Sequence, residues 1–294
     1  MTGPNRAKFL HNLLSNDILG LKAGASAPAA LMNIKGQQVA WMRVMAEEDA
    51  MVCELPLSVR DTVVEAFIHY KVGTPVRFAK PDTVIFAMVG DGEIGRERLK
   101  DLGFEAFPSA PETFVSTSLE GATILISRGH DIPAMGFTLH VNSAEAAGFE
   151  ERLRRCLGEP VPGPVFDTLR VEEGIPWHGI DVTEDNLLHE TGQLLVYHSS
   201  SKGCYLGQEV VARLEGRGGN VNRRFRGMRC EAVVTKGAEI TLEGKAVGRV
   251  TSAGFSPEFG PIAMGFVHRA SAEAQTRVSV AGVEAAIVVL PFRN

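Results

Sequence analysis

Apolar residues recur at helical spacing in several segments of the chain, which predicts amphipathic helices. Asn5, Ser58 and Ser143 each precede one of the first three helices and can cap its N-terminus. Pro164 suits the first turn of the fourth helix, at 165–173, because the N–H that proline lacks is unpaired there in any case. The apolar faces of the first three helices consist of Phe9, Leu10, Leu13 and Leu14; Val63, Val64, Phe67 and Ile68; and Phe149, Leu153, Cys156 and Leu157.

Shorter apolar or alternating segments, bounded by glycine and proline, predict β-strands. The segments 29–34 and 39–45 flank Lys35-Gly36-Gln37 and predict a hairpin. Further strands of the first half are expected at 51–55, 84–89, 122–127 and 137–141. Beyond Arg229, alternating segments predict an all-β barrel or sandwich, with strands at 238–242, 246–252, 262–267, 276–280 and 283–290. The pattern indicates an α+β protein whose last part is all-β.

The composition is that of a globular protein with more than one domain. The chain has 294 residues, of which 45% are hydrophobic and 22% charged, so two or three cores are possible and disorder is not expected. The net charge of −5 argues against binding of polyanions over the whole surface. Between Lys202 and Arg229, however, seven basic residues stand against two acidic ones. This segment is either a solvated arginine-rich loop or, as we favour, a surface that faces an anion.

The cysteines at 53, 156, 204 and 230 have neither close pairs nor a Cys-x-x-Cys spacing. They predict no disulfide framework and no metal or iron–sulfur ligand set. The N-terminus has no signal-peptide pattern, and no apolar run is long enough to span a bilayer. We therefore expect a soluble, cytoplasmic protein without membrane contact.

The segment Lys202–Glu209 (KGCYLGQE) combines a cation, a thiol, a phenol and two glycines in eight residues. It reads as an extended segment that turns at Gly207 into a short helix ending at Gly216. Cys204 then lies just before the positive end of that helix, and Lys202 lies on the same side of the extended segment. Both features favour a thiolate, although a free cysteine is as often a small buried hydrophobe.

These eight residues resemble the signature of the YgfZ-type relatives of the glycine-cleavage T-protein, a folate-binding family. The segments 169–174, 179–181 and 248–252 and the closing Leu290-Pro291-Phe292 are also similar to parts of this family. The resemblance implies a T-protein-like ring of three domains, with antiparallel sheets and a C-terminal β-barrel. Tetrahydrofolate is expected in the central cleft of that ring.

The resemblance also suggests domain limits. We expect an N-terminal α+β folate-binding domain at 1–80, completed by part of 160–225, a central α+β domain at 81–160, and the barrel at 226–294. Family members usually carry a further strand ahead of the first helix. Because this chain opens at Met1-Thr2-Gly3-Pro4, either its start is truncated or one sheet has lost an edge strand.

The family's folate-binding glutamate falls at Glu172 in this sequence. A carboxylate can accept two parallel N–H bonds from the amide-like edge of the pterin ring. Arg213 and the arginines within 223–226, Arg223 among them, would meet the anionic glutamate tail of the cofactor, and Tyr205 and Glu190 complete the cofactor-binding residues.

Three residues are candidates for chemistry. Cys204 and Lys202 would form a polarised thiol site at the edge of the cleft. Asp61 falls where the true aminomethyltransferases place their catalytic aspartate, but Glu54-Leu55-Pro56-Leu57 stands where those enzymes carry an asparagine-containing motif. The alternative function, a folate-dependent aminomethyltransferase in which Asp61 polarises the reacting amine, is therefore the less favoured one.

The favoured function, implied by the resemblance, is that of a non-enzymatic folate-binding protein. It would support iron–sulfur enzymes, including those that modify tRNA. Its partners would be those enzymes or cluster-assembly proteins, with at most weak direct contact to nucleic acid.

A further motif competes with this interpretation. Gly90–Gly95 matches the Gly-x-Gly-x-x-Gly dinucleotide fingerprint after an apolar strand, and Glu112 lies near the distance expected for a ribose contact. The next segment is short and interrupted by Pro108 and Pro111, and no alternation of strands and helices follows it. Dinucleotide binding is therefore disfavoured.

Overall fold

The computed structural model describes residues 1–90 and 92–293, apart from the side chain of Met135. Its described strands form three antiparallel sheets. The first contains β1 (Ser26–Met32), β2 (Gln38–Ala46) and β3 (Met51–Glu54), in that order. The second has the order β4 (Thr83–Met88), β7 (Phe137–Asn142), β6 (Ala122–Arg128) and β5 (Thr113–Leu119). The third is a closed barrel in the order β10 (Lys245–Ser256), β11 (Gly260–His268), β8 (Arg223–Cys230), β13 (Val283–Val288), β12 (Arg277–Val280) and β9 (Glu239–Leu242).

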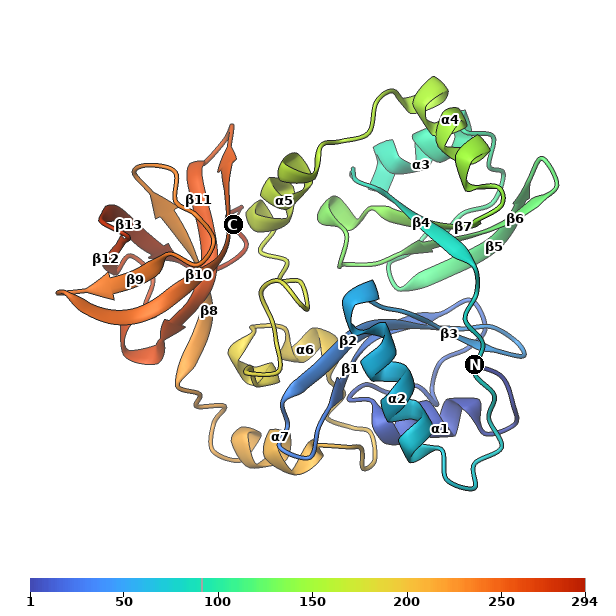
Figure 1. The fold of residues 1–294 in the computed structure, drawn as a ribbon, viewed down its shortest axis with the longest axis horizontal. Helices are drawn as coiled ribbons and strands as arrows, with labels where there is room; N and C mark the ends of the chain where they lie inside the picture. Colours follow the sequence, from blue (N-terminus) through green and yellow to red (C-terminus); the bar gives the residue numbers. More distant parts are fainter. Residues whose placement is uncertain (91, 294) are drawn as a thin grey trace.

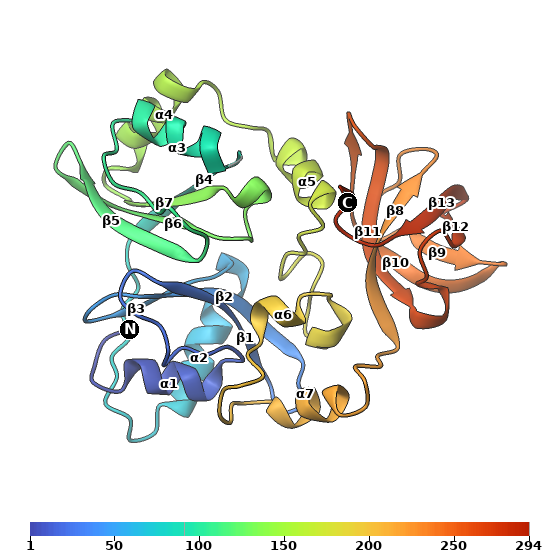
Figure 2. The same cartoon turned by 180° about the vertical axis from the view of Figure 1, so that it is seen from behind.

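The helices lie around and between these sheets. They are α1 (Arg6–Leu13), α2 (Arg60–Tyr70), α3 (Gly92–Asp101), α4 (Ala146–Leu157), α5 (Gly163–Glu172), α6 (Leu194–Tyr197) and α7 (Gln208–Glu215), with 3-10 turns η1 (Leu57–Val59), η2 (Pro133–Met135), η3 (Leu188–Glu190) and η4 (Arg269–Ser271). Figures 1 and 2 show the three units at the corners of a triangle, with α5 between the second sheet and the barrel and α7 on the way from the first unit to β8. The predicted α+β class with a C-terminal barrel is confirmed. No helix in the described part of the chain is long and apolar enough to cross a membrane.

The first unit follows the predicted pattern closely. The hairpin of β1 and β2 packs on α1, whose Phe9, Leu10 and Leu13 are buried. The prediction that Ser58 caps α2 is wrong, because Ser58 lies within η1 and Val59 takes the N-cap position without a side-chain bond. Asn5 occupies the N-cap position of α1 but its side chain makes no capping hydrogen bond.

The second unit contains one strand that the pattern did not predict. In β5 the polar run Ser116-Thr117-Ser118 conceals the alternation, and Phe114 and Leu119 at its ends are buried. The glycine fingerprint at 90–95 leads into α3, although residue 91 lies outside the described residues. The sheet is antiparallel, so the parallel, doubly wound sheet that a dinucleotide site needs is not formed here.

The barrel includes an arginine-rich strand, β8, that the sequence pattern did not reveal. Its sequence, RRFRGMRC, alternates between two faces, because successive side chains of a strand point in opposite directions. Met228 and Cys230 belong to the barrel core, whereas Phe225 belongs to a different cluster outside the barrel. The predicted domain limits stay predictions; the barrel sheet begins at Arg223.

A shared core joins the first unit, the 171–197 segment and the barrel. Trp41 of β2 stacks on Tyr197 of α6, with ring centres 4.2 Å apart, and both lie in one cluster with Val171, Phe225 and Met264. Burial of large aromatic side chains contributes strongly to such contacts. The relative positions of α5, α6 and the barrel are therefore fixed by packing, and this places the candidate site residues.

Candidate functional site

Lys202, the first residue of the KGCYLGQE segment, points into the protein and caps α1. Its ammonium group donates to the carbonyl oxygens of His11 and Leu14 at the C-terminal end of that helix. It also lies 4.7 Å from the centre of the Tyr205 ring. Burial lowers the pKa of Lys202 to about 8. A lysine at a helix C-terminus pairs with otherwise free carbonyls, so Lys202 has a structural task in this fold.

Tyr205 and Gly207 are also engaged in packing. Tyr205 is buried in a small cluster with Met32 and Val211, and burial raises the pKa of its phenol. Its hydroxyl is buried without a hydrogen-bond partner among the described residues. Gly207 has a φ of +81°, and a Cβ added there would lie 2.5 Å from the carbonyl oxygen of Asn33. Only glycine therefore fits between α7 and the β1–β2 hairpin.

Cys204, by contrast, is exposed. Residues 203–205 form no regular strand, so the geometry expected to place Lys202 beside the thiol does not apply. No hydrogen bond or ion pair joins Cys204 to Lys202 within the described residues. The nearby Lys202, Tyr205 and Gly207 serve the packing of the protein. The exposed thiol of Cys204 is accessible to a reagent or to a partner protein.

The exposure of Cys204 predicts the order of thiol modification. We expect iodoacetamide to modify Cys204 faster than Cys156, and about tenfold or more faster than Cys53 and Cys230. Burial raises the pKa of both Cys53 and Cys230 to about 11, which leaves little of the reactive thiolate. Mass spectrometry of the native protein at neutral pH measures the four rates, with Cys204→Ser as the control. Modification of Cys156 at the rate of Cys204 would contradict the expectation.

Glu172 lies in the last turn of α5 and is 5% exposed. The helix ends in a Schellman arrangement, in which the N–H of Ile175 donates to Arg170 and that of Gly174, at φ +66°, donates to Val171. The Glu172 side chain accepts no hydrogen bond from a described residue, and among these residues its one ion-pair partner is Arg293, with Nη2 3.7 Å from Oε2. A nearly buried carboxylate thus keeps most of its capacity to accept hydrogen bonds.

Arg170, two residues before Glu172, was not singled out by the sequence analysis, yet it joins three parts of the structure. It is 1% exposed, and its guanidinium donates to Asp181 Oδ2 at 2.5 Å and to Ser252 Oγ of β10 at 2.7 Å. Asp181 Oδ1 accepts from the hydroxyls of Thr251 and Ser252, at 2.5 and 2.7 Å. This buried pair connects α5, the following loop and the barrel.

Glu190 and Arg223, both assigned to the cofactor by resemblance, bind each other. Arg223 Nε and Nη2 donate to the two carboxylate oxygens of Glu190 at 3.1 and 2.9 Å, a bidentate pair. The N–H of Leu187 donates to the same carboxylate at 3.1 Å. Arg213 forms an exposed ion pair with Glu209, one turn before it on α7. Folate binding by these residues stays a prediction and requires an exchange of partners.

Asp61 lies in the first turn of α2, where it is exposed and pairs with Arg60 at 2.8 Å. The hydrogen bond from Arg60 lowers the pKa of Asp61. An ionised carboxylate at a helix N-terminus is favoured by the helix dipole, so this position has a structural explanation.

A second buried cluster, also missed, joins the first and second sheets. Arg43 of β2 is 3% exposed and lies among Glu54, Glu112 and Asp131, while donating to Ser127 Oγ at 2.7 Å. Two histidines belong to the same cluster. His140 pairs with Glu54 at 2.9 Å, and His130 pairs with Glu112 at 2.7 Å.

The hydrogen bonds from these histidines, aided by Arg43, outweigh the effect of burial and hold the pKa of both Glu54 and Glu112 below the usual range. Glu112, the ribose candidate of the dinucleotide hypothesis, is thus committed to this cluster. In the part of the chain that the structure describes, no group of three or more histidine, cysteine, aspartate or glutamate side chains is placed to hold a metal ion.

The sequence contains a feature that could have identified Arg43 and Arg170 as buried cations. Arg43 is a cation within the apolar run Trp41–Met45, and Arg170 stands between Leu169 and Val171 on a helix face that packs inward. A charged side chain at a core position is rarely buried without a partner. The signal identifies the buried cation but gives no indication of which carboxylate it meets.

Comparisons with known proteins relate this chain to the glycine cleavage T-protein. Residues 223–293 match the model of the glycine cleavage T-protein C-terminal barrel domain. The chain is 25% identical to an aminomethyltransferase of Thermotoga neapolitana, over 99% of this chain and 82% of that protein. It is 28% identical to the tRNA-modifying protein YgfZ of Cronobacter sakazakii, over 75% of this chain and 65% of that protein.

One solved structure shows the same fold. The aminomethyltransferase T of the glycine cleavage system from Bartonella henselae superposes with a TM-score of 0.89, at 22% identity, over 99% of this chain and 82% of that one. This likeness confirms the T-protein-like fold expected from the sequence. Against some curated relatives, YgfZ among them, the chain spans 65% of their length.

Proposed function

Since this chain is a YgfZ-like relative of the glycine cleavage T-protein, we propose that it binds tetrahydrofolate and supports iron–sulfur enzymes, including enzymes that modify tRNA. Its similarity to aminomethyltransferases and to the tRNA-modifying protein YgfZ supports a folate-related function. In the proposal, folate binding and the exposed thiol are separate features of one protein. Glu172 holds the pterin, and Cys204 meets the partner enzyme.

The state of Glu172 carries the folate part of the proposal. Its carboxylate is nearly buried, and the guanidinium of Arg293, 59% exposed and itself 2.6 Å from Glu258, only partly compensates it. Burying a charge without partners is costly, so such a group is retained where a ligand supplies the missing donors. The amide-like N–H groups of a pterin are donors of the right kind, since two of them lie parallel and match the two oxygens of a carboxylate.

The proposal gives Cys204 a role outside the folate site. The thiol is exposed in a segment whose lysine, tyrosine and second glycine serve packing. An exposed thiol can engage a cluster-bearing partner directly. Asp61, which the alternative function needs as a catalytic group, is instead held by Arg60 on the exposed first turn of α2.

Tetrahydrofolate binding to the Glu172→Gln variant tests this proposal. We expect the dissociation constant to rise about 10- to 100-fold, because a hydrogen bond to a charged group contributes roughly 1.5–3 kcal/mol. Glu173→Gln is the matched control, since Glu173 is the neighbouring residue at the C-cap and should leave binding unchanged. Isothermal titration calorimetry under reducing conditions measures both. Equal affinities of the wild type and Glu172→Gln would reject Glu172 as the anchor.

The same preparations distinguish the alternative function. Amine-dependent one-carbon transfer from a loaded folate is measured in the wild type and in Asp61→Asn. Turnover that Asp61→Asn abolishes would establish an aminomethyltransferase and overturn the non-enzymatic proposal. Absence of turnover together with Glu172-dependent binding supports it.

A further inference from the structure

The arginines at the start of β8 point to two different sides of the barrel wall. Arg223 lies on the face that meets Glu190, outside the barrel. Arg224 and Arg226 lie on the opposite face, in register with the core residue Met228, because side chains alternate along a strand. The basic segment recognised in the sequence is therefore divided: Arg224 and Arg226, expected with Arg223 at the folate tail, lie on a different face of β8 from Arg223.

Arg224 and Arg226 line a cavity of about 320 Å³ at one end of the barrel. The third basic residue in it is Arg269, at the start of η4, which follows β11. Glu273 is the acidic residue of the lining, and Ala272, Ala274 and Val289 complete it. Three guanidinium groups against one carboxylate give the cavity a net charge of +2. A concave site lined mainly by one sign of charge concentrates ligands of the opposite sign.

No carboxylate among the described residues forms an ion pair with the three arginines of this cavity. Arg226 is fixed by hydrogen bonds to the carbonyl oxygens of Ala272 and Phe225, at 2.8 and 2.9 Å, which are neutral acceptors. The guanidinium groups of Arg224 and Arg269 have no hydrogen-bond or ion-pair partner within residues 1–90 and 92–293. Burial and, after it, the charge of Arg224 lower the pKa of Arg226, and the charge of Glu273 opposes them.

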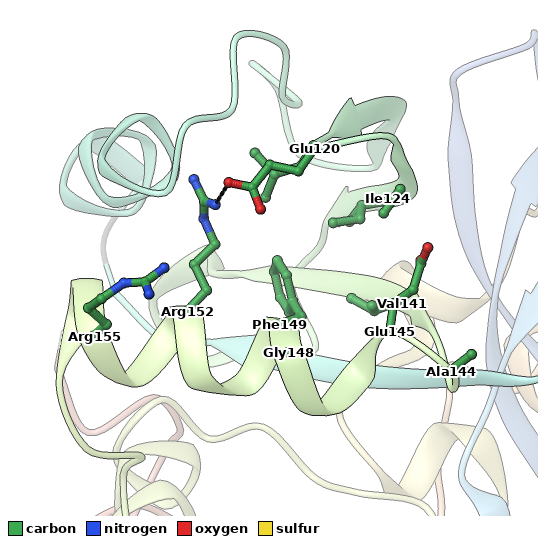
Figure 3. Close-up of a pocket in the computed structure, with 11 residues that line it drawn as sticks. Glu120, Ile124, Val141, Ala144, Glu145, Gly148, Phe149, Arg152 and Arg155 are labelled. Carbon is green, nitrogen blue, oxygen red and sulfur yellow. Dashed lines mark hydrogen bonds and ion pairs between the residues drawn. The ribbon is translucent and has the colours of Figure 1, made fainter.

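A second cavity on the molecule lacks these features. It has about 350 Å³ and lies between α4 and the strands β5, β6 and β7. Figure 3 shows Arg152 of this cavity directed at Glu120, with which it forms an ion pair. Arg152 also donates to the carbonyl oxygen of Leu102 at 2.9 Å, and Glu145 offsets the remaining cation, Arg155. The lining is close to neutral, so an unbalanced positive charge is not a general property of hollows on this surface.

We propose that the cavity formed by Arg224, Arg226 and Arg269 binds the phosphate group of a small phosphate-bearing ligand. Guanidinium groups form planar, paired N–H donors that match phosphate oxygens, and such charge-assisted bonds are among the strongest in proteins. The net charge of +2 matches one doubly charged phosphate. The size of the cavity is at the lower end of the range for small-molecule sites, which favours a compact ligand over an extended polymer.

Titration of the whole protein with sodium pyrophosphate at low ionic strength tests the site. We expect saturable 1:1 binding by calorimetry that weakens about tenfold or more in Arg224→Gln and in Arg269→Gln, because each removes a charge-assisted contact. Glu273→Gln removes the opposing charge and should strengthen binding severalfold. Arg155→Gln, which removes an exposed arginine of the other cavity, is the matched control and should change the affinity by less than about twofold.

We expect these variants to fold, because Arg224 and Arg269 are exposed and neither guanidinium has a hydrogen-bond or ion-pair partner among the described residues. We also expect Arg224→Gln to leave tetrahydrofolate affinity unchanged, because Arg224 lies on the opposite face of β8 from Arg223, so failure of this proposal and failure of the folate proposal are distinguishable. The absence of saturable binding at millimolar pyrophosphate, or equal losses in Arg224→Gln and Arg155→Gln, would overturn the proposal. So would Arg224-dependent binding of an RNA oligonucleotide that pyrophosphate does not displace, which would indicate a nucleic-acid surface instead.

Discussion

Replacing Arg170 by methionine is expected to destabilise the protein by about 3–5 kcal/mol, the usual cost of leaving one partner of a buried ion pair alone. Asp181 would keep its hydrogen bonds from Thr251, Ser252 and the N–H of Trp177 but lose the cation that balances its charge. The loop after α5 and the packing of α5 on β10 should loosen together, because Asp181 holds both. Methionine keeps a similar length and apolar stem, so lost packing adds little to the effect.

Urea unfolding followed by tryptophan fluorescence measures this change. Trp177 is a suitable probe, because the Arg170 guanidinium lies 5.5 Å from the centre of its ring. Arg154→Met is the control, since Arg154 forms exposed ion pairs with Glu150 on α4 and with Glu159 beyond its end, so this change should cost less than about 1 kcal/mol. A loss in Arg170→Met no larger than that of the control would show that the pair does not hold α5 to the barrel.

Replacing Arg43 by methionine is the second change with a large expected effect, again about 3–5 kcal/mol at neutral pH. Arg43 is the cation shared by three carboxylates, those of Glu54, Glu112 and Asp131, between the first and second sheets. Without it these carboxylates, of which Glu112 and Asp131 are partly exposed, repel one another, and among the described residues His130 and His140 remain to compensate them. The first and second units should separate more easily as a result.

The loss of folding stability caused by Arg43→Met should depend on pH. In the wild type the pKa values of Glu54 and Glu112 are lowered in the fold, so these groups stabilise it above their unfolded pKa, near 4.3, and lose that contribution as pH falls through the folded pKa. Removing Arg43 takes away one cause of the lowering. The folded pKa values rise, and the difference in stability between the wild type and Arg43→Met should shrink as pH falls through the folded pKa values of the variant and then through those of the wild type, below about 4.3.

Urea unfolding at a series of pH values measures that difference. Arg98→Met, which breaks an exposed pair with Asp101 on α3, serves as the control and should cost less than about 1 kcal/mol at every pH. A penalty at Arg43 that is independent of pH would mean that the carboxylates around it are not the groups that it neutralises.

The KGCYLGQE segment shows how far a motif can be interpreted before its structure is known. The sequence predicted a turn at Gly207 and a short helix after it, and both are present, with α7 beginning at Gln208. It also placed Lys202 beside the thiol of Cys204, whereas the lysine caps α1, about 190 residues earlier in the chain. Local pattern predicts local backbone, but a long side chain takes its partner from whatever the fold brings near.

Glu190 and Arg223 illustrate the same limit. Each was assigned to the cofactor from its place in a motif, and the fold pairs them with each other. The strand that carries Arg223 was itself missed, because an arginine-rich segment with two apolar and one glycine position in its centre gives no clear alternation of polar and apolar residues.

The amino-acid sequence by itself determined the elements with regular apolar periodicity, the glycine positions that turn the chain, and the order of an α+β part followed by an all-β part. These depend on interactions between residues close in the chain, so local pattern is sufficient for them. The tertiary structure alone decided which charges lie together: the buried pairs of Arg170 with Asp181 and of Arg43 with its carboxylates, and the three arginines at the barrel's end, of which Arg224 and Arg269 are exposed. Electrostatic partners depend on distances of a few ångströms between remote segments, and only the packing of the whole chain sets those distances.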